Sequence, residues 1–390
     1  MRLLLLVLLA APAGAVWTDT GGSAMQFLRV TPGARALALG EAYGPVAVGA
    51  EAMYWNPAGL ARLARPDFSY SHAEMLGLLR HDHAAFSAPF HRIGGAWGLA
   101  ASFFHQDSIP LVTNTDQTIG SFAPHGEALA LGYARRLFVG EDNPAEDRSF
   151  FQDLWRHPGA PEPLDHEPEP WTGSLAVGGA FKFASETIYD ESAWAVALDV
   201  GANFRPVDLP EMSMSATLRN LGTHPRFRGE SEPLPLEGAV GVAYAAELDG
   251  HRLLPAFEVA VPAQGKPYGK LGLEYSLPVA GDWRASIRAG YKSLAAYDLG
   301  PLAGLAGGVG FSGSCLSVDF AFTPMGALGE VFRGSFGWRF ETPDMIPRER
   351  HSGKRIDGRI RPIAPGRPEK PGKPGKPEPA PRRPDDRRRY

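Results

Sequence analysis

The stretch His81-Asp82-His83 has two histidines, one on either side of an acidic residue. Of all stretches in the sequence, it is the most similar to a metal-binding pattern. Successive side chains of a β-strand point to opposite faces, so the two imidazoles would share one face of a strand. A zinc site takes at least three protein ligands, and no third ligand stands at a definable spacing. The sequence therefore predicts no metal site. The alternative interpretation is a polar pair at the rim of a barrel.

The other chemical motifs are incomplete. Residues 308–313 match GxGxxG, but dinucleotide binding needs a helix to begin there, and residues 317–322 alternate as a strand. Glu167 and Glu169 lie in an acidic, proline-rich stretch, and neither a GxSxG nor a GxxxxGK[ST] motif occurs. The single Cys315 excludes an intramolecular disulfide. We predict no cofactor and no enzyme activity, although a site assembled across strands would leave no spacing signature.

The elements that would position these residues are β-strands, because apolar and polar residues alternate repeatedly after residue 66. Leu271, Leu273 and Tyr275 share one face of such a segment, and Lys270 and Glu274 share the other. Counting these segments gives 14, an even number as in single-chain bacterial barrels. The predicted strands are 67–76, 80–90, 93–105, 126–139, 171–185, 192–205, 211–221, 237–248, 251–262, 268–279, 282–294, 302–311, 314–323 and 331–340.

The polar faces of these strands carry small residues and charges of both signs, which suits the interior of a barrel whose apolar face meets lipid. A soluble sandwich, with its apolar face inward, is the alternative. The fold prediction is all-β, a 14-stranded antiparallel transmembrane β-barrel over residues 65–340. The predicted lumen-facing charges are Lys182, Asp199, Arg219, Glu258, Lys270, Glu274, Arg284, Arg288, Asp319 and Arg333.

The two ends of the chain differ from this body. Residues 1–15 read as a signal peptide cleaved after Ala15, and no later stretch has the roughly 20 apolar residues of a spanning helix. Residues 341–390 hold 15 basic and 8 acidic residues and many prolines, so they are predicted to be a disordered, basic tail. The tail could tether the protein to cell wall or anionic lipid, or be an unselective extension.

Loop lengths predict which side each end faces. If the first strand starts in the periplasm, the short turns fall on the periplasmic side (inside) and the long loops on the outer side of the membrane (outside). Both termini are then periplasmic. The acidic, proline-rich insertion 140–170 is an exception, because it is long yet falls on the inside. We interpret it as a tolerated loop insertion or as a cap or docking segment. An exported protein with a tail poor in aromatic residues is not expected to bind nucleic acid.

Residues 16–64 precede the first strand and do not alternate. The part at 33–63 is rich in Ala and Gly, and it ends in Asn56-Pro57-Ala58-Gly59. Small residues allow close packing, and Pro57 fixes a corner before the first strand. We therefore predict an N-terminal plug in the barrel lumen, with Asn56, Pro57, Ala58 and Gly59 as its defining motif.

This N-terminal stretch resembles the signature of the PorV/PorQ family, within the wider FadL-like group of outer-membrane barrels. The similarity is carried by residues 33–43, 46–48 and 52–61 and continues at 68–72, 193–201, 218–222, 233–236, 288–291 and 336–340. It implies a 14-stranded barrel with its N-terminal segment in the lumen. Two departures from the family are the insertion at 140–170 and the 50 residues after Phe340, where such barrels normally end.

The resemblance implies two alternative functions in the bacterial outer membrane. The first is protein secretion or surface attachment of a type IX kind, with secretion components or exported cargo as partners beside outer-membrane lipid. The alternative is a FadL-like transporter that passes small hydrophobic molecules. An apolar cavity near Met53 to Leu60 with an opening in the wall would favour transport. A sealed lumen with an apolar surface on the outer loops would favour partner binding.

Overall fold

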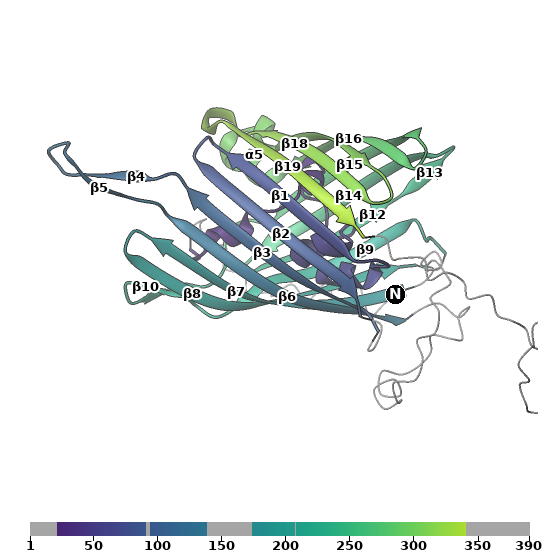
Figure 1. Cartoon of the computed structure of the whole chain (residues 1–390), viewed down its shortest axis with the longest axis horizontal. Helices are drawn as coiled ribbons and strands as arrows, with labels where there is room; N and C mark the ends of the chain where they lie inside the picture. The colour runs from purple at the N-terminus through teal and green to yellow at the C-terminus, as the bar shows by residue number, and fades with distance from the viewer. Residues whose placement is uncertain (1–21, 91–93, 139–173, 207, 341–390) are drawn as a thin grey trace, which may run out of the picture. The chain divides into compact units, whose positions relative to one another are not determined.

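Fourteen antiparallel strands close into a barrel in the computed structural model of the chain, which describes residues 22–90, 94–138, 174–206 and 208–340 (Figure 1). The predicted signal peptide 1–15, the insertion 140–170 and the tail 341–390 lie outside the described residues. The strand β13 (Ala246–Leu248) pairs with β14 alone and continues the line of β12 after Ala245, so the two count as one wall strand. This confirms the predicted fold class and strand number.

Each wall strand pairs with its neighbours along the chain, and β1 pairs with β19 to bring the two ends of the barrel together. The wall strands are β1 (Asp67–Met75), β2 (Leu79–Pro89), β3 (Ala96–Gln106), β6 (His125–Phe138), β7 (Ser174–Ile188), β8 (Glu191–Arg205), β9 (Met212–Gly222), β12 (Glu237–Tyr244), β14 (His251–Pro262), β15 (Tyr268–Ala280), β16 (Trp283–Lys292), β17 (Leu305–Ser312), β18 (Leu316–Pro324) and β19 (Glu330–Arg339).

Large apolar side chains are exposed on the outer faces of the strands, where they alternate with buried small or charged residues that face inward. A continuous apolar band of this kind is unfavourable in contact with water, because exposed apolar surface costs free energy there. The exposed set includes Leu99, Phe103, Leu129, Leu131, Phe181, Phe183, Trp194, Leu198, Leu253, Phe257, Leu271, Leu273, Ile287, Val309, Phe320, Phe332, Phe336 and Trp338.

The two ends of the barrel differ in their connections. At the end where β1 begins, which we call the short-turn end, Gly281-Asp282 and Gly313-Ser314-Cys315 join neighbouring strands. The opposite long-loop end carries larger elements. They are the hairpins β4 (Ile109–Val112) with β5 (Thr118–Phe122) and β10 (Arg226–Phe227) with β11 (Glu230–Ser231), the helix α5 (Ser293–Leu299), and the 3-10 turns η4 (Pro301–Gly304) and η5 (Gly326–Leu328).

The hairpin β4–β5 extends well beyond the wall, as Figure 1 shows at the left. The sequence predicted no strands between 105 and 126, and this long connection between β3 and β6 contains two. Each strand of the hairpin is short and holds Pro110 or Gly120, so the alternation is too brief to register as a strand.

Residues 22–63 lie inside the barrel as short helical turns, drawn in purple in Figure 1. They form η1 (Gln26–Arg29), α2 (Ala34–Ala38), η2 (Gly49–Glu51), α3 (Ala52–Trp55) and η3 (Pro57–Arg62). Ala34, Ala36, Ala38, Leu39 and Tyr43 are almost fully buried there. We call this stretch the lumen segment. Its small residues fit because backbone meets backbone: a Cβ on Gly290 of β16 would overlap the main chain at Gly40.

Candidate functional site

The motif Asn56-Pro57-Ala58-Gly59 forms a fixed corner of the lumen segment against β7 and β8. Asn56 is fully buried, and its Oδ1 accepts a hydrogen bond from the Ala58 amide at 3.1 Å. Its Nδ2 donates to the carbonyl oxygens of Gly44 and Ala202 at 3.3 and 3.2 Å. Asn56 is thus the N-cap of η3 and also ties two parts of the lumen segment to the wall.

Glycines in the wall make room for this corner. A Cβ on Gly178 of β7 would lie 2.5 Å from the Pro57 carbonyl carbon and 2.6 Å from the Ala58 nitrogen. A Cβ on Gly201 of β8 would overlap the Asn56 side chain. Close approach of another backbone is a recognised reason for glycine within a strand.

On the side of the barrel opposite this corner, a buried network of charges holds the lumen segment to the wall. Glu274 accepts from Arg35 of α2 at 2.7 and 2.8 Å and from Arg288 at 2.6 Å, and Arg288 also donates to Asp319 at 2.6 Å. Glu274 is 2% exposed. Two arginines therefore share one carboxylate, with Asp319 as the second anion, so the lumen segment is fastened to β15, β16 and β18 through paired charges.

Further pairs line the rest of the lumen. Lys182 lies 2.7 Å from Asp199, and Lys270 lies 2.6 Å from Glu258, which also accepts from the Gly44 amide at 2.9 Å. Arg219 pairs with Glu237, which accepts from the Tyr268 hydroxyl at 2.6 Å. Lys292 reaches Glu41 of the lumen segment at 2.7 Å. These contacts pair the named carboxylates with cations of the described lumen.

The structure places nine of the ten predicted lumen charges on the inner face, each at most 8% exposed. Arg284 differs, because it lies half-exposed at the short-turn end and donates to the Gly250 carbonyl at 3.0 Å. Seven of the nine are brought together as ion pairs with one another, which are Lys182, Asp199, Glu258, Lys270, Glu274, Arg288 and Asp319. Arg219 pairs with Glu237, which sequence reasoning missed, and Arg333 donates to Thr31 at 3.3 Å.

The start of the lumen segment covers the lumen at the long-loop end. The Met25 amide donates to Glu186 near the end of β7 at 3.2 Å, and the Ala24 amide donates to the Pro233 carbonyl at 3.0 Å. The Phe27 ring occupies the space that a Cβ on Gly126 would need. Met25, Phe27 and Leu28 are at most 6% exposed and pack against alanines of β6, β7 and β8, and Arg29 lies 3.6 Å from Glu237. We call residues 22–30, which these contacts hold, the cover segment.

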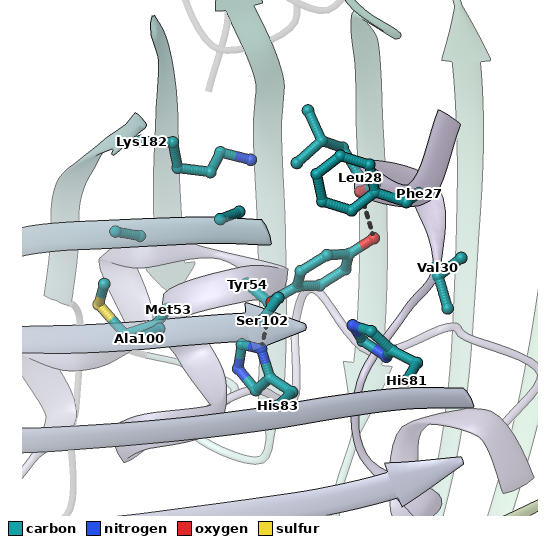
Figure 2. A pocket seen from close by; sticks show the side chains of 12 residues that line it. Phe27, Leu28, Val30, Met53, Tyr54, His81, His83, Ala100, Ser102 and Lys182 are labelled. Carbon is teal, nitrogen blue, oxygen red and sulfur yellow. Dashed lines mark hydrogen bonds between the residues drawn. The ribbon is translucent and has the colours of Figure 1, made fainter. Parts of the chain in front are cut away.

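A small cavity of about 30 Å³ lies directly below the cover segment (Figure 2). Phe27, Leu28, Val30 and Met53 form its apolar side, together with alanines of β3 and β6. His81, His83, Ser102, Tyr54 and Lys182 form its polar side. A cavity of this volume can hold at most about two water molecules.

His81 and His83 are 2% and 5% exposed, so they lie inside the barrel and the predicted rim position is wrong. The rings point from β2 towards Tyr54 of α3, with their centroids 6.3 Å apart (Figure 2). His83 Nδ1 lies 2.8 Å from Ser102 Oγ, whereas His83 Nε2 and His81 Nδ1 have no hydrogen-bond partner. Their shared strand face could be predicted, but their burial depends on a distant segment.

Tyrosines of the lumen segment remain protonated donors. Burial raises the pKa of Tyr54 above its usual range, and its hydroxyl donates to the Leu28 carbonyl at 3.1 Å. Burial, followed by the charge of Glu51, also raises the pKa of Tyr43, whose hydroxyl donates to Glu51. Tyr54 therefore links α3 to the cover segment at neutral pH.

Within the described ranges, no group of three or more His, Cys, Asp or Glu side chains is arranged to hold a metal ion. The helices in these ranges are all too short or too polar to span a bilayer. What the described residues define is a closed barrel with a segment of its own chain packed inside.

No protein-family model matches the sequence, and no curated protein matches it either. Among solved structures, the chain is similar to the toluene transporter TodX of P. putida, with 9% identity, a TM-score of 0.46, and 80% of this chain and 99% of that chain covered.

The CymD monoaromatic hydrocarbon channel gives 10% identity and a TM-score of 0.46, covering 80% of this chain and 98% of that one. A FadL homologue of Pseudomonas aeruginosa gives 10% identity and a TM-score of 0.45, covering 80% of this chain and 99% of that one. Similarity at this level is too weak to carry an argument about function. Membership of the PorV/PorQ family stays a prediction.

Proposed function

We propose that the chain is a bacterial outer-membrane β-barrel that admits small apolar molecules from its long-loop end. The exposed apolar band around the wall supports residence in lipid, since strands that alternate apolar-out and polar-in are typical of membrane barrels. A closed barrel also pairs each wall strand with two neighbours and leaves no free sheet edge in the wall, as a bilayer requires.

The observation that carries the proposal is the cavity beneath the cover segment. Much of the described lumen is filled by ion pairs and by backbones in contact, but here Phe27, Leu28, Val30 and Met53 border open space. Apolar linings with a few placed polar groups are typical of small-molecule sites. The cavity also lies near Met53, where we expected an apolar site in a transporter.

Passage requires movement of the lumen segment. Among the described residues each wall strand pairs with both neighbours, although β8 and β9 pair only from Ala197 on and shift register between Leu198 and Val200. The cover segment separates the cavity from the long-loop end, so it is the part that must move, and its buried Met25, Phe27 and Leu28 then leave their contacts with the wall. Polar solutes would still meet the ion-paired lumen below.

Secretion or surface attachment is a second candidate. It is favoured by the projecting hairpin β4–β5, whose Ile119 and Val112 are 70% and 51% exposed and which carries unpaired strand edges. A partner chain could pair with such an edge. The cell-wall or lipid tether assigned to the tail lies outside the described residues and stays a prediction.

Uptake by intact cells tests the proposed function, because the lipopolysaccharide leaflet retards apolar solutes. Cells that carry the chain in their outer membrane are expected to take up radiolabelled toluene several times faster than cells without it. Uptake of a disaccharide is expected to stay the same, since the ion pairs of the lumen remain in place. Equal toluene rates in both strains would overturn the proposal, and faster disaccharide uptake would indicate a general pore instead.

A further inference from the structure

We propose that arginines inside the short-turn end of the barrel form a binding site for an acidic polypeptide, and that the insertion 140–170 of this chain occupies it. This inference goes beyond the proposed function and does not depend on it. The site consists of Arg62 of η3 and of three wall residues, Arg136 of β6, Arg205 of β8 and Arg252 of β14. We call these four side chains the arginine cluster.

The wall members of the cluster lie on the inner face of the barrel. Residues two positions apart on a strand share a face. Arg205 and Arg252 are two positions from Asn203 and Leu254, which are buried in the lumen. Arg136 donates from Nε to a main-chain carbonyl oxygen of η3 at 3.4 Å. The cluster therefore faces the lumen, and the head groups of the surrounding lipid are not its partners.

The four guanidinium groups are close enough to influence one another. Burial, followed by the charges of Arg205, Arg252 and Arg136, lowers the pKa of Arg62 to about 9. Like charges gathered in a partly buried place repel one another, and a bound anion relieves that repulsion. A surface that concentrates one sign of charge also attracts a partner of the opposite sign. The cluster thus favours an anionic partner.

Among the residues that the structure describes, no carboxylate forms an ion pair with Arg205 or Arg252. Glu274 is already shared by two other arginines. Glu247 lies opposite Arg252 in the strand register, but its side chain is exposed. An acidic segment from outside the described ranges can therefore bind Arg205 and Arg252 without breaking an existing ion pair.

The insertion 140–170 has the charge and the attachment points that this site requires. It holds 9 acidic and 2 basic residues, a formal net charge of −7. It belongs to the connection that leaves β6 after Phe138 and returns to β7 at Ser174, and Ser174 pairs in register with Arg205. Both ends of this connection thus lie beside a member of the cluster, since Arg136 is two residues before Phe138.

The covalent attachment favours the insertion over a free periplasmic peptide. About 30 residues in an extended form span on the order of 100 Å, so each arginine of the cluster is within reach. A segment tethered beside its site has an effective concentration far above that of a free peptide with the same charge. We therefore infer that the acidic insertion of the same chain is the occupant.

Trypsin cleavage at Arg148 and Arg156, which lie within the insertion, tests this inference on the purified full chain in a non-ionic detergent. At low salt, cleavage at both sites is expected to be several times slower in the wild type than in R205Q/R252Q, because a bound segment must open before it is cut. High salt, which screens the attraction, is expected to remove the difference. Hydrolysis of a small chromogenic substrate corrects for the activity of trypsin in each buffer.

A second variant changes only the insertion, so the described barrel keeps its sequence. It replaces four acidic side chains by their amides, E162Q/D165N/E167Q/E169Q. Its cleavage is expected to be faster than that of the wild type, as in R205Q/R252Q. Heat-modifiable mobility on gels shows whether both variants are folded barrels.

The matched control is R226Q/R228Q, which removes two exposed arginines from the hairpin β10–β11 at the long-loop end. It is expected to be cleaved like the wild type. Equal cleavage of wild type and R205Q/R252Q at low salt overturns the inference, and so does an equal increase in R226Q/R228Q. Protection that is lost on deletion of 341–390 but kept in R205Q/R252Q also overturns it, because the basic tail would then hold the insertion.

Discussion

Replacing Gly178 by valine is expected to push the corner Asn56-Pro57 off the wall and make the barrel conduct ions. The new Cβ would lie 2.5 Å from the Pro57 carbonyl carbon and 2.6 Å from the Ala58 nitrogen, and these backbone atoms cannot rotate away as a side chain can. Overpacking of this kind costs about 1–3 kcal/mol. Displacing the corner also breaks the bonds from Asn56 to Gly44 and Ala202.

Planar-bilayer recordings measure the effect. The wild type is expected to be closed to ions, and Gly178→Val to show frequent openings and a lower melting temperature. Gly179→Val is the matched control, because the next residue faces outward and its Cβ would meet nothing closer than 3.5 Å. Similar current from both variants, or from neither, would show that this corner does not seal the lumen.

Glu274→Gln is expected to destabilise the folded barrel by about 3–5 kcal/mol, because it leaves two buried arginines with one carboxylate less. Arg35 loses both of its bonds to a charged partner, and Arg288 keeps only Asp319. Since Arg35 belongs to α2, the loss also loosens the lumen segment from the wall. The side chain of Gln has nearly the same size, so packing changes little.

Unfolding in urea, followed by the heat-modifiable mobility of the barrel on gels, gives this difference. Glu74→Gln provides the comparison, because Glu74 is exposed and lies 3.9 Å from Arg80. Such a surface pair is worth about 0–1 kcal/mol. A loss of less than 1 kcal/mol for Glu274→Gln would mean that the buried network contributes little to stability.

The wall was the part that the sequence predicted well, and the reason is physical. Lipid outside and a crowded lumen inside force a strict alternation, so Leu271 and Lys270 point to opposite faces wherever the strand lies. Strand ends were less accurate, as for β17, which begins at Leu305 rather than at 302 because Pro301–Gly304 form η4. The sequence did not predict the hairpin β4–β5, because neither face of this hairpin is buried.

The cavity could not be predicted, because it depends on which part of the lumen segment meets which strand. His81 and His83 show their shared face in the sequence, but Tyr54 and Leu28 reach them only through the path of the chain inside the barrel. Gly178 and Gly201 likewise read as strand glycines until the corner at Asn56 is placed against them. Contacts between such distant residues leave no local pattern.

The central claim is that apolar molecules enter when the cover segment moves, and a reversible lock tests it most directly. Ala24 and Pro233 are joined by a backbone hydrogen bond of 3.0 Å, so their Cα atoms are near enough for a designed disulfide. The variant A24C/P233C is made in a Cys315→Ser background, so that no other thiol is present.

Toluene uptake is then measured in cells that carry this variant, before and after reduction with dithiothreitol. The account predicts that the oxidised form takes up toluene no faster than cells without the barrel, and that reduction restores the wild-type rate. The Cys315→Ser parent, treated in the same way, is expected to show no change. Equal uptake by the oxidised and reduced forms would contradict the claim that the cover segment controls entry.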